Sequence, residues 1–244
     1  MNRDDGAYHA RPDETADLRS RRKALIREVI DEARSILRHD PTGRLGRAVV
    51  RAMLAVPRER FIPQHDAVLA YANTALTIGH GQTISQPLIV ALMSHLLQVG
   101  PEHTVLEVGT GSGYQAAVLS KMVMHVYTIE TVQALGIAAR ELLHHEHYEN
   151  VTVRVGDGAE GWPEHAPYDG VIVTAAARTI PAALVDQLRP GGHLVMPVEE
   201  PDGEQWLVVL HKHDNGYSST RRVLPVRFVP LTGPGAAADG FGAS

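Results

Sequence analysis

The sequence contains no cysteine, which excludes disulfide bonds, thiol catalysis and cysteine-ligated metal. No run of residues approaches the ~20 apolar positions that a membrane-spanning helix needs, and the charged stretch at residues 1–23 has no apolar core typical of a secretory signal. A formal net charge of −5 gives no overall attraction to nucleic acid or to an anionic membrane. We therefore expect a cytoplasmic, monomeric protein with neither of those partners.

The 244 residues include 44% apolar residues, enough for the core of one domain. Residues 1–16 are polar without periodicity and are expected to be a disordered N-terminal extension. Apolar residues at helical spacing begin at residue 17, and residues 17–87 are expected to form a helical cap that ends in a glycine-rich substrate loop. Residues 88–232 carry the main domain and complete one globular unit with the cap. Residues 233–244 read as a flexible tail.

Short apolar runs alternate with helical patterns in the main domain. Such alternation predicts a parallel sheet covered on both faces, a Rossmann-like, doubly wound α/β fold. Two later runs flank the Asn215-Gly216 turn and predict a C-terminal antiparallel hairpin that closes the sheet. The predicted strands are 104–108, 126–130, 151–155, 169–174, 193–198, 205–210 and 218–228, and the predicted helices are 17–38, 45–56, 88–99, 112–122, 131–147 and 181–188.

A glycine turn connects the first predicted strand to the next helix. It contains Gly109, Thr110, Gly111, Ser112 and Gly113, and its glycines allow the backbone to approach a ligand closely while the N–H groups of the helix face it. A dinucleotide-binding turn would have its third glycine one residue later, where this chain has tyrosine. The spacing, with an acidic residue two positions ahead of the turn, resembles the cofactor loop of class I S-adenosylmethionine methyltransferases.

Acidic residues stand beside this turn and at the ends of the next two predicted strands. Glu107 precedes the turn, Glu130 ends the second strand, and Asp157 follows the third. A carboxylate at Glu130 can accept hydrogen bonds from both hydroxyls of a ribose, and Asp157 with Gly158 is expected to meet an adenine edge. Each acid taken alone has another interpretation as a helix cap or turn former. Together they predict a nucleoside site at one edge of the sheet.

Beyond the glycine turn, seven segments between residues 56 and 233 resemble the protein-L-isoaspartate O-methyltransferase family. The resemblance implies S-adenosyl-L-methionine as methyl donor, S-adenosyl-L-homocysteine as product, and damaged proteins that contain isoaspartate as substrates. It further implies that Ser85 engages the substrate carboxylate and that Thr83, Ile84 and Thr232 belong to the donor site. The segments are VPRERFIP (56–63), IGHGQTISQP (78–87), VLEVGTGSGYQAAVL (105–119), GDG (156–158), YDGVIVTAA (168–176), LRPGGHLVMPV (188–198) and VRFVPLTG (226–233).

Elementary chemistry accounts for a loop that lacks a catalytic base. An α-carboxylate has a pKa of ~3.5, so the nucleophile is already ionised near pH 7. Catalysis then depends on holding its oxygen in line with the methyl group at ~3 to 3.5 Å. Thr83 and Ser85 offer hydrogen-bond donors for that purpose without competing as nucleophiles. Because Pro87 suits the first position of a helix, Ser85 has a competing interpretation as a helix cap.

Contacts to peptide backbone would let such an enzyme accept many damaged sequences. Val226, Arg227 and Phe228 are strand-like and end at a proline, so they are expected to lie beside an extended peptide, although they also fit a plain closing strand. Thr174 follows the fourth strand and is expected near the transferred methyl group, or to serve tight packing. Val226, Arg227, Phe228 and Thr174 are therefore the candidate substrate contacts of this part of the chain.

Two other functions remain open at this stage. One is a related methyltransferase that modifies an aspartate of one dedicated peptide and forms an aspartimide. The other is a nicotinamide-binding oxidoreductase, or an inactive binding module, on the same fold. We expect no metal site, although His144 and His147 lie three apart on a predicted helix and His211 and His213 alternate on a strand. The run RSRRK at 19–23 is interpreted as the solvated side of the first helix.

Overall fold

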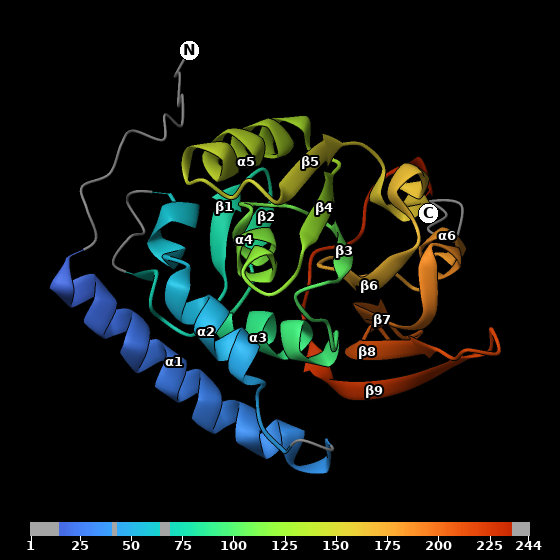
Figure 1. Cartoon of the computed structure of the whole chain (residues 1–244), viewed down its shortest axis with the longest axis horizontal. Coiled ribbons are helices and arrows are strands. Elements are labelled where there is room, and N and C mark those ends of the chain that lie inside the picture. The colour runs from blue at the N-terminus through green and yellow to red at the C-terminus, as the bar shows by residue number, and fades with distance from the viewer. Residues whose placement is uncertain (1–14, 41–42, 64–68, 236–244) are drawn as a thin grey trace.

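The structure is a computed structural model that describes residues 15–40, 43–63 and 69–235 (Figure 1). Most of the expected N-terminal extension and residues 236–244 of the expected tail lie outside the described residues. The described chain forms a seven-stranded sheet with helices on both of its faces, together with a separate two-stranded sheet. The predicted Rossmann-like α/β fold is confirmed.

The large sheet has the strand order β5-β4-β3-β6-β7-β8-β9. Neighbouring strands from β5 to β7 are parallel, whereas β8 and β9 pair antiparallel as the predicted hairpin. β7 begins five residues before its predicted start because residues 188–192 add an irregular extension beside β6. The strands are β3 (Thr104–Val108), β4 (His125–Glu130), β5 (Val151–Val155), β6 (Tyr168–Val173), β7 (Leu188–Glu199), β8 (Gln205–Lys212) and β9 (Ser218–Val226).

Alternate side chains of the central strands enter two separate hydrophobic cores. Val105 of β3 and Ile172 of β6 lie in the core beneath the helices of the cap, whereas Leu106 and Val171 lie in the core on the other face. Burial on both faces explains why these strands are continuously apolar. The helices are α1 (Ala16–Ile36), α2 (Arg47–Ala55), α3 (Pro87–Leu96), α4 (Tyr114–Ser120), α5 (Gln133–His145) and α6 (Ala182–Asp186), and no described helix has the length and apolarity required to cross a membrane.

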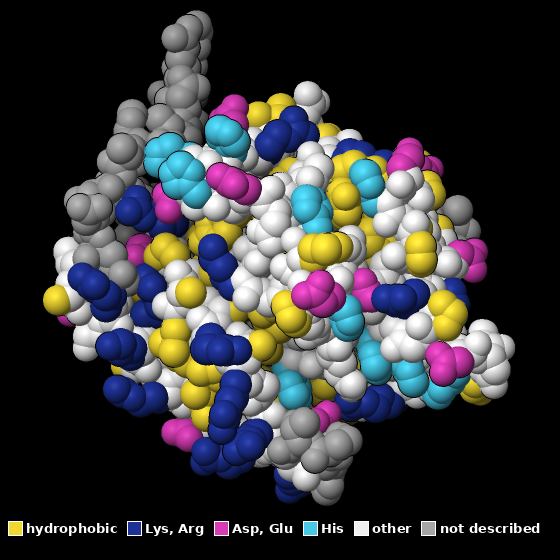
Figure 2. Space-filling view, viewed as in Figure 1, with side chains coloured by type: hydrophobic (Ala, Val, Ile, Leu, Met, Phe, Trp, Pro, Cys, Tyr) yellow, Lys and Arg dark blue, Asp and Glu magenta, His cyan; other side chains and the backbone are white. Residues whose placement is uncertain are grey.

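Helix α1 runs along one outer edge of the molecule and packs on α2 and α3 (Figure 1). It begins one residue earlier than predicted because the Thr15 hydroxyl accepts a hydrogen bond from the backbone N–H of Leu18, at 3.3 Å. Lys and Arg side chains gather over α1 and α2 on the surface (Figure 2). Arg21 is among the exposed residues, as predicted. The solvated-face interpretation is wrong for Arg22, which is only 6% exposed.

A short hairpin precedes α3, in a segment where the sequence predicts a loop. β1 (Leu76–Gly79) pairs antiparallel with β2 (Gln82–Ile84), and Gly79, His80 and Gly81 at the turn all have positive φ. Two glycines make this left-handed turn accessible. The methyl end of Ile78 lies 3.5 Å from the position that a Cβ on Gly111 would take. The hairpin therefore packs against the glycine turn.

The histidines of β7 and β8 stack on one another. The rings of His193 and His211 lie 4.5 Å apart and nearly parallel, and His213 lies 4.3 Å from His211. Burial, followed by the neighbouring His211 and then by Arg221, lowers the pKa of His193 to about 4. In the described ranges no group of three histidine, aspartate or glutamate side chains is arranged to hold a metal ion. His147 lies beyond the end of α5, so its predicted helical pairing with His144 is wrong.

Candidate functional site

A pocket of about 520 Å³ lies at the carboxyl ends of β3, β4 and β6. Here the order of the sheet changes direction, since the chain leaves β3 for β4 on one side and later returns to β6 on the other. Ligands of open α/β sheets bind at such switch points. We call it the glycine-turn pocket, and its lining residues are Gln82, Thr83, Val108, Gly109, Gly111, Ile129, Glu130, Thr131, Gly158, Thr174, Ala175, Val229, Pro230, Leu231 and Thr232.

The glycine turn itself requires glycine at its first position. Gly109 has φ +94°, and its N–H donates to the carbonyl of Ile129 at 2.8 Å. A Cβ on Gly109 would lie 2.4 Å from the hydroxyl oxygen of Thr174, which itself donates to the Gly109 carbonyl at 2.7 Å. Gly111 and Gly113 also have positive φ. The backbone is thus held in a conformation that side chains rarely adopt.

Glu130 joins the turn to the end of β4. One of its carboxylate oxygens accepts from the Gly111 N–H at 2.8 Å and the other from the Val132 N–H at 2.9 Å. These bonds fix the orientation of the carboxylate in the pocket wall, while each oxygen keeps a lone pair for a further donor. The predicted position of Glu130 beside the glycine turn is therefore observed.

Glu107 is fully buried and does not line the pocket. Neither of its carboxylate oxygens has a hydrogen-bond partner within the described residues. Burial raises the pKa of Glu107 to about 8; the nearby hydroxyl of Thr128 opposes this rise, and the negative charge of Glu130 adds to it. A buried carboxylate without a partner is costly. Glu107 therefore lies behind the glycine turn as an unsatisfied acceptor, and its contact with a donor molecule stays a prediction.

Asp157 follows β5 by two residues but does not line the pocket. Its two carboxylate oxygens accept from the N–H of Ala159 at 2.9 Å and of Gly235 at 2.6 Å. It thereby ties down the chain that follows the pocket wall at residues 229–232. Its neighbour Gly158 does line the pocket, and a Cβ there would lie 2.3 Å from a methyl group of Val108. A direct adenine contact from Asp157 stays a prediction.

Other predicted donor-site residues lie behind the pocket surface. The hydroxyls of Thr110 and Thr128 share a buried hydrogen bond of 2.7 Å, and Ser112, Gly113 and Ile84 are buried without lining the pocket. The residues that the sequence analysis missed are almost all neighbours in sequence of predicted ones, and that adjacency was the available signal. They are Gln82, Val108, Ile129, Thr131, Ala175, Val229, Pro230 and Leu231.

A second hollow, which we call the Ser85 groove, lies between the cap and β9; it is open to solvent and spans about 1150 Å³. All but one of the predicted substrate contacts line it. The exception is Thr174, which lies in the glycine-turn pocket instead. Thr83 lines both spaces and connects them. The groove residues are Glu32, Ile36, Thr74, Ala75, Thr83, Ser85, Gln86, Leu88, Ile89, Leu224, Pro225, Val226, Arg227 and Phe228.

The hydroxyl of Ser85 is not a helix cap. Helix α3 begins at Pro87, as predicted, but the free N–H of Leu88 donates to the side-chain oxygen of Asn73 at 3.1 Å. Gln86 reinforces this arrangement by donating to the Asn73 carbonyl at 3.1 Å. Across the described residues the Ser85 hydroxyl has no hydrogen bond. The competing interpretation of Ser85 is therefore wrong, and its hydroxyl can donate into the groove.

The end of β9 is tied to its own chain. Val226 pairs with Gln205 in the sheet, which agrees with a closing strand. Phe228 donates its N–H to the side-chain oxygen of Gln205 at 2.7 Å, and its carbonyl accepts from the same amide at 3.3 Å. The backbone of Phe228 is thus already satisfied. A peptide in the groove would meet its ring and the exposed side chain of Arg227 rather than its backbone.

These observations distinguish a dinucleotide-binding fold from the fold of the class I S-adenosylmethionine-dependent methyltransferases. A dinucleotide turn would need a glycine where Tyr114 begins α4, and the ring of Tyr114 is 3% exposed in the cap core. The fold and pocket are those of a class I S-adenosylmethionine-dependent methyltransferase. The family model described as Protein-L-isoaspartate(D-aspartate) O-methyltransferase matches residues 32–236. The chain belongs to this family.

Individual relatives agree with that assignment. The chain is 51% identical over 212 residues to Protein-L-isoaspartate O-methyltransferase 2 of Syntrophobacter fumaroxidans, covering 87% of this chain and 86% of that protein. Protein-L-isoaspartate O-methyltransferase 2 of a Polaromonas species is also 51% identical over 212 residues, which cover 86% of this chain and 96% of that protein.

Solved structures extend the likeness to the fold. One protein-L-isoaspartate O-methyltransferase superposes with a TM-score of 0.75 at 27% identity, covering 87% of this chain and 66% of that chain. A Plasmodium falciparum chain described as a protein-L-isoaspartate O-methyltransferase, solved with S-adenosyl-L-homocysteine, gives a TM-score of 0.71 at 28% identity and covers 86% and 98%.

The residues present fit S-adenosylmethionine. The fixed carboxylate of Glu130 keeps acceptor capacity in the pocket wall that suits the hydroxyls of a ribose, whereas Glu107 is buried behind that wall. Gly109 and Gly158 leave no room for a side chain between the strands and the pocket. The donor set suits a cationic nucleoside and lacks a cluster of basic residues for a pyrophosphate.

Replacing Glu107 with Gln should stabilise the protein without ligand and weaken donor binding. The folded pKa of about 8 lies above the unfolded value of ~4.3, so the stability that the neutral carboxyl contributes is lost as pH rises through 8. Gln keeps the neutral state, and we expect a gain of about 1 to 3 kcal/mol at pH 8.5 and little at pH 4. Thermal unfolding at both pH values and calorimetric titration with S-adenosylmethionine measure the two effects.

The exposed Glu204→Gln is the control for this prediction. An equal gain in melting temperature at both pH values, or unchanged donor affinity, would contradict the role assigned to Glu107.

Proposed function

We propose that this chain transfers a methyl group from S-adenosyl-L-methionine to the free α-carboxylate of isoaspartyl residues in damaged proteins, and so begins their repair. The family match over residues 32–236 supports the reaction. The observation that carries the proposal is that the Ser85 groove meets the glycine-turn pocket at Thr83. Because one residue lines both spaces, a carboxylate in the groove and a donor in the pocket can approach each other.

The groove works on a nucleophile that is already charged. An isoaspartyl α-carboxylate ionises far below pH 7, so no base needs to remove a proton. Among the residues that line the two spaces there is no histidine or lysine, and the ionisable ones are Glu32, Glu130 and Arg227. Glu130 is committed to backbone N–H groups and Glu32 accepts from Asn73 at 2.8 Å. The site is therefore equipped to position reactants rather than to transfer protons.

Ser85 and Arg227 supply the interactions with the carboxylate. The Ser85 hydroxyl donates a hydrogen bond to one oxygen, and its orientation fixes the other oxygen toward the pocket. The guanidinium of Arg227 lines the same groove and attracts an anionic substrate. Leu88 and Ile89 form an apolar wall that excludes water, which strengthens both contacts.

The glycine-turn pocket holds the donor through Glu130 and the backbone of Gly109, Gly111 and Gly158, and Glu107 supports the turn from behind. Bound S-adenosylmethionine supplies an electrophilic methyl group on a positively charged sulfur. The protein contributes a rigid cradle, since the turn is bonded to both neighbouring strands through Ile129 and Thr174. Such preorganisation lowers the barrier by fixing the distance between the reacting atoms.

A pair of peptides that differ only in an isoaspartyl or an aspartyl linkage tests the function. With S-adenosylmethionine present, we expect the isoaspartyl peptide alone to gain one methyl group by mass spectrometry, because only that linkage leaves a free α-carboxylate attached directly to Cα. A peptide without either residue serves as the control for non-enzymatic methylation. Methylation of the aspartyl peptide would replace the proposal with modification of a dedicated aspartate.

We further propose that the chain acts in the cytoplasm and as a monomer. The large apolar side chains that the described residues expose are few and lie in five separate segments of the chain, which supports a monomer; they are Leu54, Leu69, Met124, Ile137 and Tyr217. Light scattering after size-exclusion chromatography tests the oligomeric state, and a mass of twice 26.5 kDa would contradict it.

A further inference from the structure

Arg58 occupies the centre of the wall behind the Ser85 groove. It is 1% exposed, and its guanidinium donates to the carbonyls of Ala70 at 2.9 Å, Thr74 at 3.1 Å and Ser85 at 3.0 Å. The guanidinium also lies 5.8 Å from the ring centre of Tyr114, which begins the helix after the glycine turn. One side chain therefore contacts the backbone of the substrate loop and the first residue of the donor helix.

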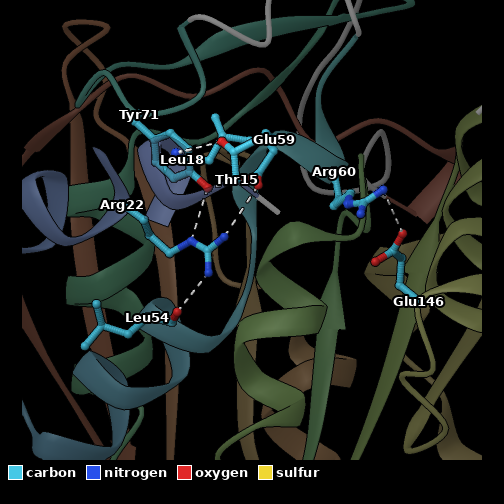
Figure 3. Close-up of polar contacts among 8 residues, drawn as sticks. All are labelled: Thr15, Leu18, Arg22, Leu54, Glu59, Arg60, Tyr71 and Glu146. Atoms are coloured by element: carbon cyan, nitrogen blue, oxygen red, sulfur yellow. Dashed lines mark hydrogen bonds and ion pairs between the residues drawn. The ribbon is translucent and has the colours of Figure 1, made fainter. Parts of the chain in front are cut away.

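The next residue, Glu59, faces helix α1. Figure 3 shows its carboxylate between the hydroxyl of Tyr71, which donates to it, and the guanidinium of Arg22, at 3.5 Å. Arg22 also donates to the Tyr71 hydroxyl at 3.1 Å and to the carbonyl of Leu54 at 3.0 Å. Burial, and then the neighbouring Glu59, raise the pKa of Tyr71, so its hydroxyl keeps its proton. These contacts attach α1 to the turn that carries Arg58.

Arg22 belongs to a part of α1 that precedes the family match at residue 32. This part of the helix packs through apolar residues such as Leu25 and Ile26. It also buries a charged side chain, whose ion-pair partner Glu59 is only 7% exposed at the side chain. Removing one partner of such a network leaves the other charge buried and unpaired, which is strongly unfavourable.

We propose that Arg58 and Arg22 are positioning residues of the methyl transfer. Arg58 fixes the backbone at Ser85 against the donor helix. Arg22 holds Tyr71 both directly and through Glu59, three residues before the groove residue Thr74. The N-terminal half of α1 thus supports the wall of the substrate site. This inference rests on the proposed function for its kinetic consequences and on the contacts alone for its structural ones.

The two residues should affect different kinetic constants. Arg58→Lys keeps the charge but cannot reach three carbonyls, so Ser85 is less well placed and kcat for the isoaspartyl peptide should fall by about tenfold or more. Arg22→Met loosens the groove wall at Thr74 and Ala75, so KM for the peptide should rise by about three- to tenfold with a smaller change in kcat. Calorimetric affinity for S-adenosyl-L-homocysteine should change by less than about twofold in both variants.

Arg21→Met is the matched control, since Arg21 is the preceding residue of the same helix and its ion pair with Asp17 is exposed. It should leave KM and kcat unchanged. Should Arg22→Met fail to fold, Tyr71→Phe removes only the hydroxyl between Arg22 and Glu59 and should raise KM in the same direction. An unchanged KM in Arg22→Met or in Tyr71→Phe overturns the proposal. A loss of donor affinity in Arg58→Lys as large as its loss of kcat overturns it as well.

A readout without turnover separates this inference from the function itself. The N–H groups of Ala72 and Thr74 are hydrogen-bonded in the wall. Their exchange with deuterium should accelerate by about tenfold in Arg22→Met and remain unchanged in Arg21→Met. Equal exchange rates in both variants would contradict the proposed coupling between Arg22 and the groove wall. Faster exchange in Arg22→Met, combined with a wild-type enzyme that methylates neither peptide, would sink only the proposed function.

Discussion

The Gly109→Ala variant should lose most of its affinity for S-adenosylmethionine. The substitution places a methyl group 2.4 Å from the Thr174 hydroxyl and forces a side chain into a backbone conformation with φ +94°. The left-handed conformation costs roughly 1 to 2 kcal/mol and overpacking adds about 1 to 3 kcal/mol. The turn must shift to relieve this strain. A strain energy of about 2 kcal/mol in the conformation that binds the donor would raise the Kd for S-adenosylmethionine by about thirtyfold.

Gly203→Ala separates the effect of backbone strain from that of the clash. Gly203 has φ +84°, but a Cβ there would meet no atom within 4 Å. This variant should lose some thermal stability and keep its donor affinity, as measured by calorimetric titration. Donor affinity in Gly109→Ala within twofold of the wild type would show that the turn tolerates a side chain and that its glycine is not required for the pocket.

The parallel sheet was predictable because its signals are local. Strands buried on both faces are continuously apolar, and their carboxyl ends converge at one edge whatever the details of packing. Glu130 and the glycine turn follow directly from that rule. Tyr114 was also informative, since it counted against a dinucleotide turn from the sequence alone and packs within the cap core in the structure.

The contacts that organise the Ser85 groove were not predictable from local patterns. Asn73 caps a helix that begins 14 residues later, and Arg22 pairs with a glutamate 37 residues away. An arginine in a charged run has the same pattern whether it faces water or a buried partner. The β1-β2 hairpin escaped detection because its strands, of 4 and 3 residues, are too short to establish an alternation.

Asp157 illustrates a further limit of sequence reasoning. A carboxylate after a parallel strand serves equally well as an acceptor for a ligand or for backbone N–H groups. The structure gives both of its oxygens to Ala159 and Gly235. Its location just after the strand was therefore inferred correctly, whereas one of its two partners, Gly235, lies 78 residues further along the chain.

Ser85→Ala should lower kcat for the isoaspartyl peptide by about 10²- to 10³-fold, comparable to the loss of one preorganised hydrogen-bond donor in other enzymes. The residue does not line the glycine-turn pocket, so affinity for S-adenosyl-L-homocysteine should stay within about twofold of the wild type. Its hydroxyl has no hydrogen bond within the described chain, and α3 is capped by Asn73. We therefore expect no loss of thermal stability.

Ser35→Ala provides the comparison for Ser85, because Ser35 lies beside the groove residues of α1 but directs its exposed hydroxyl to the carbonyl of Glu32. Single-turnover methylation of the isoaspartyl peptide, measured from pH 6 to pH 9, distinguishes positioning from proton transfer. An ionised substrate and a hydroxyl that does not titrate predict equal losses across this range in Ser85→Ala. A loss confined to one side of a titration near pH 6.5 would instead require a histidine base, and an equal loss of turnover and donor affinity would make Ser85 a support of the pocket.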